Sequence, residues 1–174
     1  MSRTSAFILT AILATGSAAG LQADARSAAA TIEVIGGPHA GKYTLATTDS
    51  GCLISERAKG KKPFEANIGI PVTDLRSKDP KALTSIRLHI FNVTATAPTP
   101  SDYQASVNFG PVMDTRLGTF YMSGFNSATG RKGGPGTVMF KNGGGTDATV
   151  SFDLQPESGI VVKGTITCTN PLRY

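Results

Sequence analysis

The stretch that decides the fold is residues 148–154, which read Ala-Thr-Val-Ser-Phe-Asp-Leu. Val150, Phe152 and Leu154 share one parity, and the residues between them are polar. A period of two is typical of a β-strand that buries one of its faces. The stretch therefore predicts a strand whose apolar side chains face a core.

The neighbouring residues extend this strand into a meander. Residues 155–159, Gln-Pro-Glu-Ser-Gly, predict a turn, because proline fixes φ and glycine accepts positive φ. Residues 160–168 alternate again, with Cys168 on the apolar side. Upstream, a strand at 138–140 ends at 142–145, Asn-Gly-Gly-Gly, which suits a hairpin connection.

The remaining chain shows the same short alternating runs and almost no helical period. We predict an all-β domain, an antiparallel β-sandwich of immunoglobulin-like type or, less favoured, a closed barrel. One helical turn is expected at 79–83, and the glycine-rich segment 130–137 is expected to be a mobile loop. The further strands are predicted at 31–35, 42–47, 51–56, 64–70, 84–93, 103–109 and 117–123.

The first 25 residues are typical of a signal peptide. A positively charged start precedes an apolar run at 6–14, and 23–25, Ala-Asp-Ala, fits the small-x-small cleavage pattern before Arg26. The alternative is an uncleaved membrane anchor, but the run is short against the roughly 20 apolar residues that span a bilayer. Removal of 25 from 174 residues leaves 149, at 26–174, which is the size of a single domain. We expect this mature domain not to insert stably into a membrane.

The chain has two cysteines, Cys52 and Cys168. In an oxidising compartment, an isolated pair far apart in sequence predicts one structural disulfide. The alternative is a free reactive thiol at Cys52. Strand parity turns both sulfurs inward, so a bridge would join the two sheets. Together with the signal peptide, this pair predicts a periplasmic or extracellular protein.

Two segments carry a resemblance. Residues 35–43, Ile-Gly-Gly-Pro-His-Ala-Gly-Lys-Tyr, with a cysteine about ten residues later, and 162–168, Val-Lys-Gly-Thr-Ile-Thr-Cys, resemble uncharacterised bacterial exported proteins. The plan is also similar to that of the mycobacterial 19-kilodalton lipoprotein antigens, whose β-rich domain ends on a cysteine-bearing strand. This chain departs from them by lacking a lipid-attachment cysteine at the cleavage point. The resemblance implies an envelope or secreted protein and transfers no catalytic residue.

Positive charge is concentrated in one segment. The chain carries a formal charge of +5, and residues 57–87 hold eight basic and three acidic residues, a difference of +5. One interpretation is a pair of solvated loops, and the other is a surface that binds an anionic envelope lipid or polysaccharide. Nucleic acid is not expected, because Phe64 is the segment's single aromatic residue. The candidate binding residues are Arg57, Lys59, Lys61, Lys62, Arg76, Lys78, Lys81 and Arg87.

The sequence offers no catalytic constellation, metal-ligand cluster or cofactor motif. His39, in a Gly/Pro turn, and His89, in a strand, are expected to be ordinary surface residues. Asp147 and Asp153 could form a glycosidase pair, but Asp153 occupies the outer face of a strand. A carbohydrate site near 124–136 would use Tyr121 and Phe125 as its aromatic residues.

These observations predict a non-enzymatic cell-envelope or secreted protein. The alternative is a binding module for an anionic glycan or lipid, acting through the basic segment 57–87. A small hydrolase is a third and more distant possibility, because catalytic groups assemble in space rather than in sequence.

Overall fold

The computed structural model describes residues 26–48, 51–55, 62–70, 79–93, 103–111, 118–126, 130–143 and 147–174. The predicted signal peptide at 1–25 lies outside these ranges. The described residues form strands and turns without a helix, and so they contain no helix that could cross a membrane. The strands are β1 (Ser27–Ile35), β2 (Gly41–Thr47), β3 (Cys52–Ile54), β4 (Phe64–Gly69), β5 (Leu83–Ile90), β6 (Tyr103–Phe109), β7 (Thr119–Asn126), β8 (Arg131–Lys132), β9 (Gly136–Asn142), β10 (Ala148–Glu157), β11 (Ile160–Thr169) and β12 (Leu172–Arg173).

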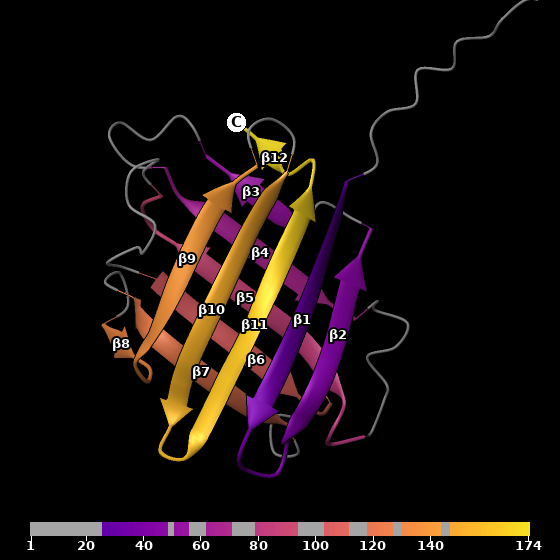
Figure 1. The fold of residues 1–174 in the computed structure, drawn as a ribbon, viewed down its shortest axis with the longest axis vertical. Helices are drawn as coiled ribbons and strands as arrows, with labels where there is room; N and C mark the ends of the chain where they lie inside the picture. Colours follow the sequence, from indigo (N-terminus) through magenta and orange to yellow (C-terminus); the bar gives the residue numbers. More distant parts are fainter. Residues whose placement is uncertain are drawn as a thin grey trace, which may run out of the picture.

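The strands form two sheets that pack face to face, and the predicted sandwich is confirmed. The smaller sheet has the order β2-β1-β11-β10-β9, and the larger has the order β12-β3-β4-β5-β6-β7-β8. The strands of the smaller sheet cross over those of the larger one (Figure 1). The strand order follows the chain more closely than the Greek-key connections of an immunoglobulin domain do. Of the two predicted alternatives, the structure therefore has the sandwich and not the closed barrel.

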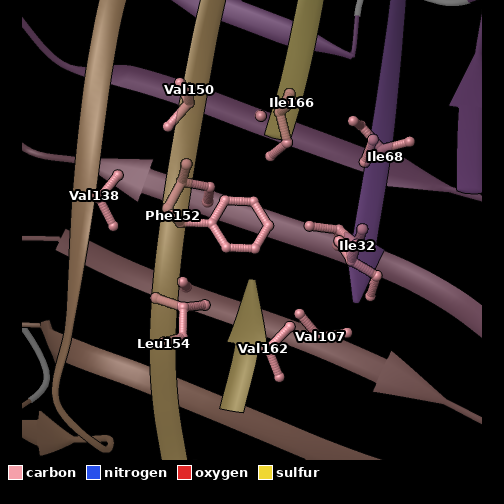
Figure 2. Close-up of a cluster of buried hydrophobic side chains, with 14 of the residues drawn as sticks. Ile32, Ile68, Val107, Val138, Val150, Phe152, Leu154, Val162 and Ile166 are labelled. Atoms are coloured by element: carbon pink, nitrogen blue, oxygen red, sulfur yellow. The ribbon is translucent and has the colours of Figure 1, made fainter. Parts of the chain in front are cut away.

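The core lies between the two sheets and is filled by the predicted alternation. Val150, Phe152 and Leu154 of β10 point inward, and Figure 2 shows them in one cluster with side chains of the larger sheet such as Ile68 and Val107. Phe152 pairs across the strands with Gly164 of β11, where an added Cβ would lie 2.8 Å from the Phe152 ring. The same Cβ would lie 2.6 Å from the Thr31 carbonyl oxygen of β1, so the neighbouring backbone and the aromatic ring together require glycine at this position of β11.

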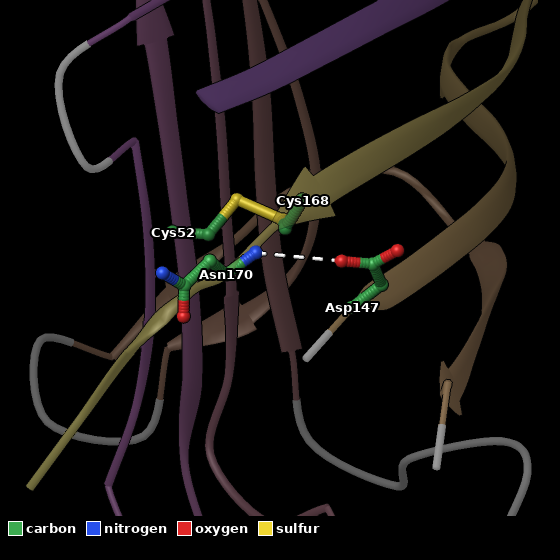
Figure 3. The surroundings of a disulfide bond; sticks show 4 residues. All are labelled: Cys52, Asp147, Cys168 and Asn170. Atoms are coloured by element: carbon green, nitrogen blue, oxygen red, sulfur yellow. Dashed lines mark hydrogen bonds between the residues drawn. A yellow bond between two sulfur atoms is a disulfide. The ribbon is translucent and has the colours of Figure 1, made fainter. Parts of the chain in front are cut away.

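The predicted disulfide is confirmed and joins the two sheets. Cys52 of β3 and Cys168 of β11 are both buried, with an S–S distance of 1.98 Å and a Cα–Cα distance of 6.0 Å (Figure 3). Just beyond it, Asn170 has φ 50°, and β12 then pairs parallel with β3. The backbone N–H of Asn170 donates to Asp147 Oδ1 at 3.4 Å. The chain thus changes sheets at a corner that is held covalently.

Two predicted irregular segments have a different structure. The expected helical turn at 79–83 is a single tight turn, in which the Ala82 N–H donates to the Asp79 carbonyl at 3.2 Å and β5 begins at once. The prediction of a mobile loop at 130–137 was wrong. It contains β8, and Gly133 and Gly134 donate to carbonyls of β7 residues, so backbone pairing fixes this segment.

Several strand ends also differ from the predictions. β1 begins at Ser27 rather than at 31, because the small residues Ala28 and Ala30 continue its buried face. β10 extends to Glu157 through a register shift after Leu154, which leaves Ser158 and Gly159 as the turn. Strands β8 and β12 had no sequence signal, because each has only two residues.

Candidate functional site

The outer face of the larger sheet carries two rows of polar and apolar side chains. Alternation and register set these rows, since cross-strand partners lie about 5 Å apart on each face. The first row runs over β5, β6 and β7 through Ser85, Asn108 and Phe120. The second, two residues along each strand, consists of Arg87, Ser106 and Met122.

A β-bulge lies at the end of the first row. The pairing of β5 with β6 shifts register between Leu83 and Ser85, which leaves Thr84 as the extra residue. Thr84 is buried, and its Oγ1 donates to the Asn108 carbonyl at 3.1 Å. Bulges redirect side chains and are common beside binding sites. Here the bulge anchors the backbone under Ser85 and Asn108.

A groove of about 410 Å³ lies over this bulge. Its volume falls within the range of about 300–1,000 Å³ that is typical of small-ligand sites. Inside it, Asn108 Nδ2 donates to Ser85 Oγ at 2.7 Å, which leaves the Ser85 hydroxyl hydrogen and Asn108 Oδ1 available to a ligand. The groove is lined by Thr84, Ser85, Arg87, Asn108, Phe109, Gly110, Pro111, Gly118, Thr119 and Phe120.

Two groups at the groove are open to solvent. The Phe120 side chain is exposed, with a relative accessibility of 52%, although it is large and apolar. Arg87 is also exposed, and no carboxylate of the described residues lies within salt-bridge distance of it. The groove therefore presents a guanidinium, a hydroxyl, an amide oxygen and an aromatic ring to the same space.

Three of the eight predicted basic residues fall within the described part of the chain. Arg87 lies on the outer face of β5, Lys81 precedes that strand, and Lys62 lies beside its far end, where the Val93 N–H donates to the Lys62 carbonyl at 2.6 Å. All three are exposed, and they are spread along β5 rather than gathered at one point. The other five, Arg57, Lys59, Lys61, Arg76 and Lys78, lie outside the described residues.

The prediction of His39 as a surface residue was wrong, because it is 5% exposed. Its Nε2 lies 3.1 Å from the Pro80 carbonyl oxygen, which can only accept, so Nε2 carries the hydrogen. Nδ1 then accepts from the Tyr121 hydroxyl at 3.0 Å. The imidazole stacks on Phe109 with ring centroids 4.4 Å apart. These contacts use both ring nitrogens and fix the β1–β2 turn against β7.

The expected role of Tyr121 in a carbohydrate site was also wrong. Tyr121 is buried on the inner face of β7, and its neighbour Phe120 is the exposed aromatic residue. Burial, and next the negative charge of Glu157, raise the pKa of the Tyr121 hydroxyl above its ordinary value of 10.0. The side chain of Phe125 lies outside what the structure describes.

His89 and the two aspartates have simple partners. His89, on the outer face of β5 as predicted, lies 3.5 Å from a carboxylate oxygen of Glu65 on β4. Asp153 pairs with Lys163 at 3.1 Å, and Asp147 accepts from the backbone of Asn170. Six residues of extended chain hold the two aspartates about 20 Å apart. Glycosidase carboxylates lie about 5–9.5 Å apart, so these two do not form such a pair.

The outer face of the smaller sheet has a different character. One of its rows carries alternating charges on adjacent strands. The next two rows consist of alanine, serine, threonine, one lysine and one methionine. A second groove, of about 460 Å³, lies at its margin along the β10–β11 turn. The charged row is Lys42, Glu33, Lys163 and Asp153, in order from β2 to β10.

Comparison with known proteins gives no further guide. No family model, curated protein or solved structure matches this chain. Within the described ranges, no group of three or more His, Cys, Asp or Glu side chains could hold a metal ion. The features of the described residues that bear on function are therefore the disulfide, the exposed cations Lys62, Lys81 and Arg87, and the groove.

Proposed function

We propose that this chain is an exported, non-enzymatic β-sandwich protein of the cell envelope or the extracellular space, with 1–25 as its signal peptide. The observation that carries the proposal is the Cys52–Cys168 disulfide, which links residues 116 positions apart and joins the two sheets. Disulfides of this kind persist in oxidising compartments and are rare in a reducing cytosol. The bridge therefore favours the periplasm or the outside of the cell.

The buried polar groups support a non-enzymatic role. Both nitrogens of His39 are used in hydrogen bonds that hold a turn, and the imidazole faces a tyrosine and a proline carbonyl rather than a nucleophile. The carboxylates considered for glycoside hydrolysis are held apart by strand β10. The described residues thus add no support for the hydrolase alternative.

Export is tested by expressing the full chain in a bacterial host and sequencing the N-terminus of the exported form. We expect a mature chain that begins at or near Arg26 and, when denatured without reduction, reacts with no thiol reagent. A chain lacking residues 1–25 should stay in the cytosol and, when denatured in the same way, contain two reactive thiols, since both cysteines are buried in the folded protein. Retention of Met1 in the exported form, or free thiols in it, would contradict the proposal.

A binding module for an anionic glycan or lipid is the second candidate. The observation in its favour is that Lys62, Lys81 and Arg87 are exposed and have no ion pair with a described carboxylate. Unpaired cations attract anionic surfaces, and the attraction is screened over about 8 Å at physiological salt. Binding should therefore weaken steeply as salt rises.

Co-sedimentation with lipopolysaccharide and with anionic vesicles tests the second candidate. The wild type is compared with a variant in which Lys59, Lys61 and Lys62 are all changed to Gln, at low and at moderate salt. We expect binding by the wild type at low salt and a clear loss in the variant. Equal binding by both proteins, or none by either, would reject this candidate.

A further inference from the structure

We propose that the groove over β5, β6 and β7 binds a carboxylated sugar residue, with Arg87 holding the carboxylate and Phe120 the ring. The inference deepens the second candidate function and rests on it, but it assigns the binding to Arg87 and the groove rather than to Lys59, Lys61 and Lys62. It follows from the side chains that line the groove and from the charge and the hydrogen-bonding groups that remain without a described partner there.

The first argument is charge. Among the described residues that line the groove, Arg87 is the one basic side chain and none is acidic. A guanidinium binds a planar carboxylate through two parallel hydrogen bonds. Phosphate groups, with up to two charges each, are usually held by several cations. A single exposed Arg therefore fits a ligand that carries one negative charge on a carboxylate.

The second argument is the neutral polar groups beside that charge. Ser85 and Asn108 are cross-strand neighbours, and the hydrogen bond between them orients both side chains. This leaves one donor, the Ser85 hydroxyl, and one acceptor, Asn108 Oδ1, fixed over the bulge. Sugar hydroxyls donate and accept in the same way, so they complement such a pair.

The third argument is the exposed ring. Phe120 lies opposite Asn108 on β7, about 10 Å from Ser85 across two strand spacings. The C–H bonds of a pyranose face are weakly positive, and an aromatic face is negative, so the two attract. A membrane surface would instead need apolar side chains that project from a convex surface. The concave groove favours a sugar residue over a lipid layer.

Isothermal titration calorimetry with tetragalacturonate tests the assignment, and the same tetrasaccharide with its carboxylates reduced to alcohols is the matched neutral ligand. We expect the wild type to bind the acidic form at least about tenfold more tightly than the neutral one. Arg87→Gln should lose at least about tenfold, and Arg87→Lys should recover only part of that loss. Phe120→Ala should lose about two- to tenfold.

Two controls separate the groove from charge in general. Lys42→Gln removes one exposed positive charge from the smaller sheet and should leave the affinity within about twofold of the wild type. Inorganic phosphate at equal concentration should not displace tetragalacturonate. Each variant changes an exposed side chain, so its denaturant midpoint should equal that of the wild type, which confirms that it is folded.

The outcomes distinguish this inference from the second candidate function. Equal affinity of wild type and Arg87→Gln, or displacement by phosphate, would overturn the groove assignment. If the triple lysine variant lost tetragalacturonate while Arg87→Gln kept it, the three lysines rather than the groove would carry the binding. If the wild type bound lipopolysaccharide but not tetragalacturonate, the second candidate would stand and the inference would fail. Binding of neither would reject both.

Discussion

The outer faces of the two sheets are built from the same kind of strand, yet they leave different groups available to solvent. On the smaller sheet, the charged side chains alternate in sign across neighbouring strands, and Lys163 contacts Asp153 at 3.1 Å. On the larger sheet, Arg87 has no described acidic partner and stands beside a groove and an exposed Phe120. Lys163 thus has a carboxylate partner on its own face, whereas Arg87 has none among the described residues.

An anionic ligand gains most binding free energy where a cation has no partner in the free protein. A paired lysine must break its existing contact before it can bind an anion, and much of the new interaction only replaces the old one. An unpaired guanidinium loses only water. The groove of the larger sheet lies over a β-bulge, beside Arg87, whereas the groove of the smaller sheet lies at its margin, along the β10–β11 turn.

Removal of the disulfide should cause the largest loss of stability, and it tests whether the two sheets unfold as one cooperative unit. Changing both Cys52 and Cys168 to Ser should lower the free energy of unfolding by about 2–5 kcal/mol, because the bridge closes a long loop. Denaturant titration followed by circular dichroism measures this loss. Thr169→Ser, an exposed change beside Cys168, is the control and should change the free energy by less than about 0.5 kcal/mol. Two separate transitions in the double variant would show that the sheets unfold independently.

The next effect separates the two sides of strand β7. Tyr121→Phe removes the donor to His39 Nδ1 and leaves a buried acceptor unpaired, so it should lower the free energy of unfolding by about 1–3 kcal/mol. Phe120→Ala, one residue away but on the outer face, should change it by about 0.5 kcal/mol or less. Equal midpoints for Tyr121→Phe and the wild type in urea would disprove the structural role of this hydrogen bond.

A smaller loss of stability is expected at high pH, where two tyrosines on the inner face of the larger sheet ionise. Burial raises the pKa of Tyr103 and of Tyr121 above the ordinary value of 10.0. The unfolded chain then releases its tyrosine protons at lower pH than the folded chain does. Stability is therefore unaffected by these groups below pH 10 and falls as pH rises above it. Urea midpoints from pH 9 to 11 should decline, and less steeply in Tyr121→Phe. Identical slopes would contradict the pKa assignment.

The smallest effect concerns the paired charges of the smaller sheet. A double-mutant cycle with Lys163→Gln and Asp153→Asn should give a coupling energy of about 0.2–1 kcal/mol that declines with salt, because both side chains are about half exposed. Removing the charge of Arg87 should leave the free energy of unfolding unchanged within error. A larger loss for Arg87→Gln than for Lys163→Gln would mean that Arg87 stabilises the fold and is not free for a ligand.

The sequence was most informative where one face of a strand is buried. The alternation in 103–109 predicts both the strand and its outer residues Gln104, Ser106 and Asn108, and all three face outward. Alternation fails at 119–123, where Phe120 and Tyr121 are adjacent and either could face the core. Which of the two side chains faces the core depends on His39, a residue 82 positions away whose Nδ1 accepts from the Tyr121 hydroxyl. Such long-range pairing is not visible in a local pattern.

The candidate site was predictable only in part. Arg87 was selected as one cation among eight, and its outward direction followed from its parity in β5. The groove itself depends on the bulge at Thr84 and on the register that sets Ser85 beside Asn108 and Asn108 beside Phe120. Register between strands is a property of the folded sheet, so no count of charges or aromatic residues could have located it.

The corner at Asn170 also determines how the molecule would respond to mechanical load. Cys168 is followed by only six further residues of the sequence, and its sulfur is bonded to a strand of the opposite sheet. Tension applied to the chain at Tyr174 would peel β12 from β3 and then meet a covalent bond. The force would pass directly into Cys52 and so into the larger sheet, before any core strand lost its hydrogen bonds. The chain between the two cysteines, which includes every residue described at the groove, would therefore carry no tension, and in single-molecule extension this part should lengthen only after reduction.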